Sequence, residues 1–185
     1  MEKIRSAVIG CGRMGAFSSD LMKKVGPKCW FPLSHIEALK EFNEISLDAI
    51  CDVNPSLLEK ARIQYSINHT YSDYDKLFSN HEIDLLCVAT RTPGRDKIIQ
   101  IGIEHGVKAF HLEKPLCNSM KQLSKLESLV TSNNVCLSYG TLRRYLNIYQ
   151  KAKDIVDSGK FGKLLQVQVN FGEAALFWTH PHSVD

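Results

Sequence analysis

The stretch AVIGCGRMG, residues 7–15, decides which fold the sequence predicts. It ends the apolar run Ile4–Ile9, which reads as a buried strand, and its glycines have G-x-G-x-x-G spacing: Gly10, Gly12 and Gly15. In such a motif the first glycine permits a tight turn, the second lets the backbone approach a pyrophosphate, and the third lets the next helix pack on the strand. We therefore expect a phosphate-binding turn, which includes Arg13 and Met14, rather than a plain glycine turn.

Beyond this turn, short apolar runs alternate with longer amphipathic ones. The strand-like runs are Ile4–Ile9, Leu47–Cys51, Leu85–Ala89, Lys108–His111 and Val135–Tyr139. The helix-like stretches are Pro55–Tyr65, Tyr74–Ser79, Lys97–Glu104 and Ser119–Val130. Strands that are apolar almost throughout belong in a parallel sheet covered on both faces. With right-handed crossovers, the predicted fold class is α/β, a Rossmann doubly wound parallel sheet.

The pattern changes after Gly140. Tyr145–Ser158 reads as a longer helix, and Lys163–Phe171 alternates apolar and polar residues, as an antiparallel strand with one wetter face does. We therefore expect the beginning of an α+β domain with a mostly antiparallel sheet. The expected domains are a Rossmann domain that binds NAD(P) at 1–118, a connecting helix, strand and domain junction at 119–145, and the incomplete start of a C-terminal α/β substrate domain at 146–185.

Asp52 is the residue expected to select the cofactor. It follows the second predicted strand, where a carboxylate accepts hydrogen bonds from both ribose hydroxyls and repels a 2′-phosphate, so we expect NAD. Asp52 lies 37 residues after Gly15, whereas the usual gap is about 20, and we assign the excess to an insertion at 17–33. Two roles fit this insertion, a lid over the cofactor or a contact with another subunit. Its lysines leave NADP open as an alternative cofactor: Lys23, Lys24 and Lys28.

Composition excludes several classes of function. The chain has 185 residues, 23 Lys plus Arg against 20 Asp plus Glu, and a formal net charge of +3, which gives no electrostatic reason to expect a nucleic acid or a membrane as partner. No stretch approaches the roughly 18 apolar residues of a membrane span. The six cysteines are scattered without a C-x-x-C pair, so we expect no disulfide framework, no zinc site and a cytoplasmic protein.

The segment HLEKPL, residues 111–116, ends a predicted buried strand with Glu113, Lys114 and Pro115. An acid and a base at such a strand end either form a solvated turn or point into a cleft. In a cleft, a partly buried Lys114 ammonium would lower the pKa of a bound hydroxyl and stabilise the alkoxide that forms as hydride leaves. Both interpretations fit the spacing when it is taken alone.

The glycine loop occurs in one order with three further segments, CDVNP at 51–55, EKP at 113–115 and GTLRRY at 140–145. This ordered set resembles the Gfo/Idh/MocA family of oxidoreductases, typified by glucose-fructose oxidoreductase and inositol 2-dehydrogenase. The resemblance implies a dinucleotide-binding domain followed by a domain built on a large, mostly antiparallel sheet. It also implies three roles at the cofactor: Lys114 as the catalytic lysine, Glu113 as its cofactor-side neighbour and Thr90 near the cofactor.

The segment LFWTHPHSVD, residues 176–185, resembles the H-x-x-D segment of the same family. The resemblance makes His182 the acid/base that takes the hydroxyl proton, with Asp185 in the aspartate position. Trp178 stands where many members have an aspartate, and His180 either replaces that group or lines the substrate pocket. Two histidines without a third placed ligand do not predict a metal site.

The expected function is that of a nicotinamide-dependent oxidoreductase, which transfers a hydride between NAD(P) and a secondary hydroxyl or keto group of a sugar, nucleotide-sugar or polyol. Arg144 either touches that substrate, holds the domain junction or is a surface arginine. Because family members are longer, we expect residues 1–185 to be a truncated chain, with or without activity of its own, and the full-length protein to be a homo-oligomer. The alternative is a non-catalytic dinucleotide-binding sensor or regulator of the same architecture.

Overall fold

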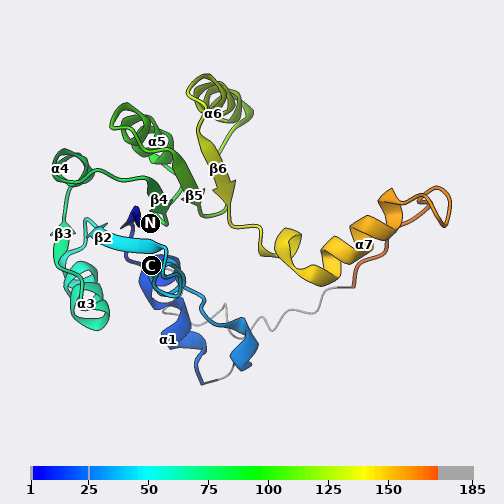
Figure 1. Cartoon of the computed structure of the whole chain (residues 1–185), viewed down its shortest axis with the longest axis horizontal. Coiled ribbons are helices and arrows are strands. Elements are labelled where there is room, and N and C mark those ends of the chain that lie inside the picture. The colour runs from blue at the N-terminus through cyan, green and yellow to red at the C-terminus, as the bar shows by residue number, and fades with distance from the viewer. Residues whose placement is uncertain (1, 25, 171–185) are drawn as a thin grey trace. The chain divides into compact units, whose positions relative to one another are not determined.

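Parallel strands joined by helices form one sheet in the first 141 residues. In the computed structural model, which describes residues 2–24 and 26–170, these strands are β1 (Ile4–Ile9), β2 (Ile45–Cys51), β3 (His69–Tyr71), β4 (Leu85–Val88), β5 (Ala109–Leu112) and β6 (Cys136–Tyr139). Their order in the sheet is β3-β2-β1-β4-β5-β6, and every neighbouring pair is parallel (Figure 1). This is the strand order of a dinucleotide-binding Rossmann fold, and it confirms the predicted doubly wound sheet.

Helices cover both faces of the sheet (Figure 1). On one face lie α4 (Tyr74–Asn80), α5 (Arg95–Glu104) and α6 (Met120–Ser132). The other face is covered by the π-helical turn η1 (Arg13–Phe17), α2 (His35–Lys40) and α3 (Pro55–Tyr65). Each face has its own core, with Leu77 and Phe110 buried in the first and Val8 and Ile36 in the second. Full burial of one such side chain stabilises the fold by about 1.5–3 kcal/mol, so the two cores hold the sheet rigid between them.

Local signals in the sequence set several element boundaries. α3 begins at Pro55, as predicted, and the side chain of Asn54 accepts hydrogen bonds from the N–H groups of Ser56 at 2.9 Å and Leu57 at 3.2 Å. The sequence does not predict β3, because a strand of three residues has no recognisable apolar period. The ends of the five strands expected in the parallel sheet are correct to within two residues.

The expected insertion is a loop closed at its base. It contains two short helices, α1 (Ser18–Met22) and η2 (Lys28–Trp30). The Ser19 hydroxyl accepts a hydrogen bond from the backbone N–H of Leu33 at 3.0 Å, which ties the two ends of the loop together. Ser34 then caps α2, because its hydroxyl accepts from the N–H of Glu37 at 3.4 Å. The insertion therefore ends where α2 begins.

The described residues from 142 to 170 belong to a second unit. It contains η3 (Leu142–Tyr145) and α7 (Asn147–Asp157). The prediction of a strand at Lys163–Phe171 is wrong over its described part, because residues 164–170 have no regular secondary structure. A strand needs a hydrogen-bonded neighbour, and this segment has none within the part of the chain that the structure describes. None of the helices in the described residues is long and apolar enough to cross a membrane.

Of the residues expected to connect two domains, 119–145, those up to Thr141 belong to the first unit. α6 packs on the sheet there, and β6 pairs with β5 as the last strand. The compact unit ends at Thr141.

Asp84, just before β4, is tied to the start of β1. Its carboxylate accepts hydrogen bonds from the backbone N–H and Nε of Arg5, both at 2.9 Å, and from Nη2 at 2.8 Å. The side-chain and then the backbone hydrogen bonds from Arg5 lower the pKa of Asp84 to about 2. A lowered carboxyl pKa stabilises the fold above about pH 4, and this stabilisation is lost as the pH falls through 2.

We expect Asp84→Asn to lower the free energy of unfolding at pH 7 by about 1 kcal/mol, a modest figure because solvent screens both side chains. Urea unfolding at pH 7 and pH 2 measures this, and the difference from wild type should be much smaller at pH 2, where Asp84 is about half protonated in the folded state. Glu82→Gln is the control, since that carboxylate is 85% exposed and should matter little. An equal loss at both pH values would contradict the assignment.

Candidate functional site

Two glycines of the turn after β1 are crowded by backbone, and the third faces open space. Gly10 has a φ of +97°, and a Cβ there would lie 2.8 Å from the carbonyl carbon of Ala89. A Cβ on Gly15 would lie 1.8 Å from the carbonyl oxygen of Gly10, so the protein itself requires both glycines. Gly12 differs, because a Cβ there would meet no atom within 4 Å. The open space at Gly12 fits the close approach of a ligand such as a pyrophosphate.

Asp52 lies at the end of β2, where it borders the glycine turn. One carboxylate oxygen accepts a hydrogen bond from the N–H of Cys11 at 2.6 Å, and the other accepts from the N–H of Asn54 at 2.7 Å. These bonds fix the carboxylate beside the turn. Each oxygen of an ionised carboxylate has a second lone pair, so both can still accept from the hydroxyls of a ribose.

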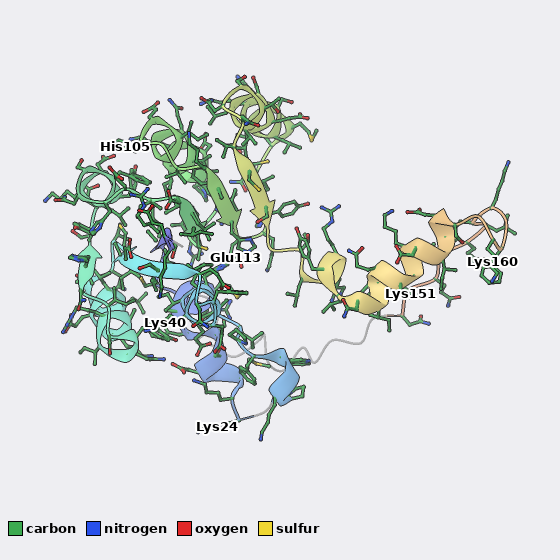
Figure 2. The ribbon with its side chains drawn as sticks, in the orientation of Figure 1. Lys24, Lys40, His105, Glu113, Lys151 and Lys160 are labelled. Carbon is green, nitrogen blue, oxygen red and sulfur yellow. The ribbon has the colours of Figure 1, made fainter. Side chains whose placement is uncertain are left out.

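Glu113 follows β5 and is buried, with 7% of its surface exposed (Figure 2). One of its carboxylate oxygens lies 3.1 Å from Nε2 of His35, the first residue of α2. Burial raises the pKa of Glu113, but the hydrogen bond and charge of His35, together with the backbone N–H of Lys114 and the charge of His111, outweigh this effect and leave the pKa below its usual value. A Cβ on Gly140 would lie 3.2 Å from the same carboxylate, so glycine leaves room for it.

His111 shares the surroundings of His35. The two imidazole rings meet edge to face with centroids 5.1 Å apart, and Nδ1 of His111 lies 2.8 Å from the hydroxyl oxygen of Ser138 on β6. Burial, and then the neighbouring His35, lower the pKa of His111. The lowered pKa favours the neutral form of His111.

Lys114 is exposed in the part of the chain that the structure describes. It stands beyond the last residue of β5 and is joined to Pro115 by a cis peptide bond. The strand ends one residue before Glu113, so the turn carries the lysine past the packed part of the sheet. The ammonium is therefore free to meet a molecule that approaches this edge of the first unit.

Arg95 and His35 are parts of this site that sequence reasoning misses. Arg95, the first residue of α5, is 2% exposed and donates to the backbone carbonyl oxygens of Thr90, Glu113 and Pro115. Charged side chains are seldom fully buried, so the sequence alone indicates a surface arginine. His35 has a weak signal, because it follows the Ser34 cap at the point where the interrupted helix resumes.

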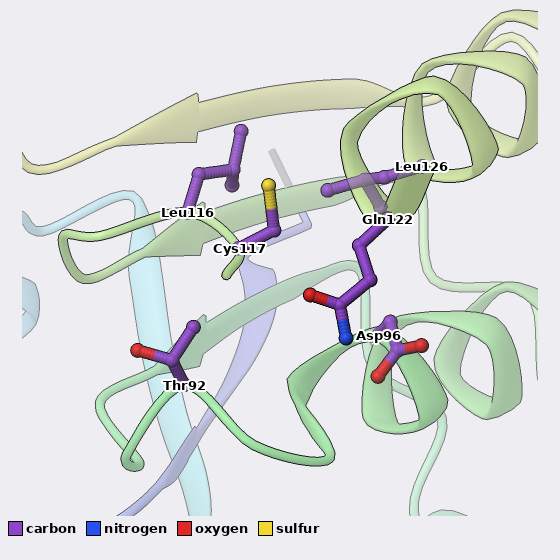
Figure 3. A pocket seen from close by; sticks show the side chains of 6 residues that line it. All are labelled: Thr92, Asp96, Leu116, Cys117, Gln122 and Leu126. Carbon is purple, nitrogen blue, oxygen red and sulfur yellow. The ribbon is translucent and has the colours of Figure 1, made fainter. Parts of the chain in front are cut away.

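A small hollow lies between α5, α6 and the segment after Pro115 (Figure 3). Its polar lining includes Thr92, Asp96 and Gln122. Its volume of about 10 Å³ holds at most one water molecule. Sites for small molecules usually occupy roughly 300–1,000 Å³, so this hollow is no substrate pocket.

The first unit thus gathers the expected cofactor residues, the glycine turn with Arg13 and Met14, Asp52, Thr90 and Glu113, at the carboxyl edge of its sheet. Arg144 lies on η3 in the second unit, where it is exposed. Three expected residues lie outside the described part of the chain: His180, His182 and Asp185. Among the described residues, no group of three or more His, Cys, Asp or Glu side chains is placed to hold a metal ion.

The glycine turn leaves β1, and the Thr90 turn leaves β4, at the point where the strand order reverses. A glycine turn open at Gly12, with a carboxylate at the end of the neighbouring strand, defines a dinucleotide-binding domain at this point. The chain belongs to the Gfo/Idh/MocA oxidoreductases, a family with an NAD-binding Rossmann fold, whose family model matches residues 4–141. NAD is accordingly the cofactor of this domain.

Curated relatives and solved structures agree with the family. D-apiose dehydrogenase of Rhizobium rhizogenes is 23% identical over 163 residues, which cover 88% of this chain and 42% of the relative. Myo-inositol 2-dehydrogenase of Thermotoga maritima is 25% identical over 160 residues, 86% of this chain and 42% of the relative. The structure of scyllo-inositol dehydrogenase from Lactobacillus casei with NAD(H) and scyllo-inositol matches with a TM-score of 0.68 and 18% identity, over 87% of this chain and 43% of that chain. The chain therefore spans less than half the length of these relatives.

The open space at Gly12 gives a direct test of cofactor approach. We expect Gly12→Ala to fold like wild type, with stability changed by less than about 0.5 kcal/mol, because its Cβ meets nothing. NADH affinity should fall by at least about tenfold if a pyrophosphate lies against this backbone. Urea unfolding and NADH fluorescence titration measure the two effects.

Gly15→Ala is the matched contrast and should be strongly destabilised, because its Cβ would overlap the carbonyl oxygen of Gly10. Undiminished NADH affinity in a folded Gly12→Ala chain would show that the cofactor does not approach there.

The His35–Glu113 pair predicts a second result. With His35→Gln, we expect the pKa of Glu113 to rise, since burial is then opposed less, and the free energy of unfolding at pH 7 to fall by about 1–3 kcal/mol. Carbon-13 NMR titration of the glutamate carboxyls follows the pKa, and urea unfolding follows stability. His105→Gln, at an exposed histidine (Figure 2), should leave the pKa of Glu113 unchanged. A Glu113 pKa that does not respond to His35→Gln would refute the pairing.

Proposed function

We propose that the whole protein is an NAD-dependent dehydrogenase that acts on a secondary hydroxyl or keto group of a polyol or sugar, with Lys114 as its catalytic lysine. One observation carries the proposal. The Glu113–Lys114 turn leaves β5 on the same sheet edge as Gly12, Asp52 and Thr90. A lysine there lies on the side of the domain where a dinucleotide binds.

Each residue has a distinct role in this proposal. The backbone at Gly12 lies against the pyrophosphate, and Asp52 accepts hydrogen bonds from the ribose. NAD, when bound, supplies the acceptor for the hydride. The Lys114 ammonium stabilises the negative charge that develops on the substrate oxygen, and His182 takes the hydroxyl proton.

The remainder of the substrate site is assigned to the second domain, which we place at 146–185 and beyond. His180 and Asp185 are its candidate substrate contacts, and Arg144, in the junction before it, is a further candidate. The exposure of Lys114 supports this division, since a lysine shared with another domain must be reachable from outside the first unit. The names of relatives that act on inositols and D-apiose support a polyol or sugar as substrate.

Two further properties belong to the proposal. The five cysteines whose side chains the structure describes are free thiols, which suits a reducing compartment such as the cytoplasm. We keep a homo-oligomer as the expected state of the full-length protein, with no nucleic acid or membrane as partner.

Titration with NADH and with NADPH tests the cofactor roles. We expect wild type to bind NADH more tightly than NADPH. Asp52→Asn should weaken NADH binding by about tenfold. It should also reduce the ratio of NADH affinity to NADPH affinity, because the charge that repels a 2′-phosphate is gone. Lys114→Ala should bind NADH like wild type and reduce turnover of myo-inositol, scyllo-inositol or D-apiose by the whole protein at least about 100-fold. Cofactor fluorescence and initial rates provide the measurements.

Lys121→Ala, an exposed lysine on α6, is the matched control and should change neither quantity. NADH binding without Lys114-dependent turnover of any polyol or sugar would instead favour a dinucleotide-binding sensor. If folded wild type bound neither cofactor, the proposal would fail.

A further inference from the structure

Among the described residues, Arg95 is the largest side chain that is almost fully buried, with 2% of its surface exposed. The partners of its guanidinium are unusual. Within the part of the chain that the structure describes, this guanidinium donates hydrogen bonds to three backbone carbonyl oxygens, through Nη1 to Glu113 and Pro115 and through Nη2 to Thr90. The bond from Nη1 to Pro115 measures 2.6 Å. No hydrogen bond pairs the guanidinium with a carboxylate among the described residues.

Burying a cation in this way is costly. Desolvation lowers the pKa of Arg95, although the charge of Glu113 opposes this effect. Nε of Arg95 is buried and has no hydrogen-bond partner among the described residues. A well-packed apolar side chain would fill the same space without these penalties, so packing alone does not account for an arginine here.

The geometry of the three carbonyls indicates what the arginine does. Glu113 and Pro115 are the residues on either side of Lys114, so a single Nη group bridges the turn that carries the lysine. Thr90 belongs to a different turn, which leaves the neighbouring strand β4. The planar guanidinium presents its N–H groups in a fixed fork, so it sets the distance between the two turns more closely than a lysine could.

We propose that Arg95 is a positioning residue, which holds the Lys114 turn at a fixed distance from the Thr90 turn. The inference rests on the proposed function for the role of Lys114, and it extends that function by coupling the cofactor side of the site to the substrate side. Because Arg95 is only 2% exposed, it acts through the three backbone carbonyls that it binds and is not itself a catalytic residue in this proposal.

Amide hydrogen exchange of the free chain tests the clamp without any cofactor. In Arg95→Lys, which keeps the charge and loses the fork, we expect amides in 113–117 and 90–92 to exchange about tenfold faster under native conditions. Amides of β1 and β2 should exchange as in wild type. Arg62→Lys is the matched control, because Arg62 also makes a two-bond contact, with Glu59, but at an exposed site on α3. Unchanged exchange in 113–117 would overturn the proposal.

A second readout separates positioning from a merely structural role. Trace acetylation with mass spectrometry reports how far NADH protects Lys114, measured against Lys121. We expect NADH to protect Lys114 in wild type and in Arg62→Lys, and this protection to be lost in Arg95→Lys at NADH concentrations that saturate it. Full protection in Arg95→Lys would make Arg95 merely structural and overturn the proposal.

If Arg95→Lys does not fold, the proposal can be tested on wild type alone. Nitrogen-15 NMR of the arginine side chains should resolve slowly rotating Nη–H groups for Arg95, which shift on addition of NADH, and averaged signals for Arg62. Averaged Arg95 signals, or signals that NADH leaves unmoved, would overturn the proposal. Absence of NADH binding by wild type would refute the proposed function and the positioning role with it, whereas the exchange data would still decide whether the clamp exists.

Discussion

Backbone hydrogen bonds across the carboxyl edge of the sheet are the constraint on which the site depends. Every strand except the edge strand β3 is followed by a residue whose N–H donates to the last residue of a neighbouring strand, at 2.8–3.1 Å: Asp52 to Tyr71, Gly10 to Cys51, Ala89 to Ile9, Glu113 to Val88 and Gly140 to Leu112. The ladder therefore continues one residue beyond the strands. Asp52, Gly10 and Glu113 belong to that extra row, so the sheet register itself fixes where the residues of the site begin.

Side chains then give the turns at this edge their separate roles. Gly10 and Gly15 are required because a side chain at either position would collide with nearby backbone, whereas no protein atom lies within 4 Å of a Cβ placed on Gly12. Glu113 is held through its side chain and through its backbone: His35 hydrogen-bonds to its carboxylate, and Arg95 donates to its carbonyl oxygen. These two residues come from α2 and α5, which cover opposite faces of the sheet. The turn that carries Lys114 is consequently fixed from both layers of the fold.

The sequence predicts the parts of this architecture that arise from local rules. Apolar runs, the Asn54–Pro55 helix start and the glycine spacing are local, and the structure agrees with them. β3 is not predicted because its three residues form a strand by pairing with β2, and sequence periodicity carries no information about this pairing. Arg95 escapes because its burial depends on three carbonyls from distant turns. Alternation at 163–170 indicates a strand, yet without a paired neighbour it forms none.

The hydrogen bond between Ser19 and Leu33 has a consequence for how this protein can diversify. It closes the insertion at its base, so residues 20–32 are a loop whose two ends are already together. Doubling the length of a flexible loop costs only about 0.6 kcal/mol once its ends are fixed. Additions to this loop therefore need not displace Gly15 on one side or His35 on the other. The cofactor domain contains a place where evolution can insert new recognition elements while the machinery for NAD stays intact.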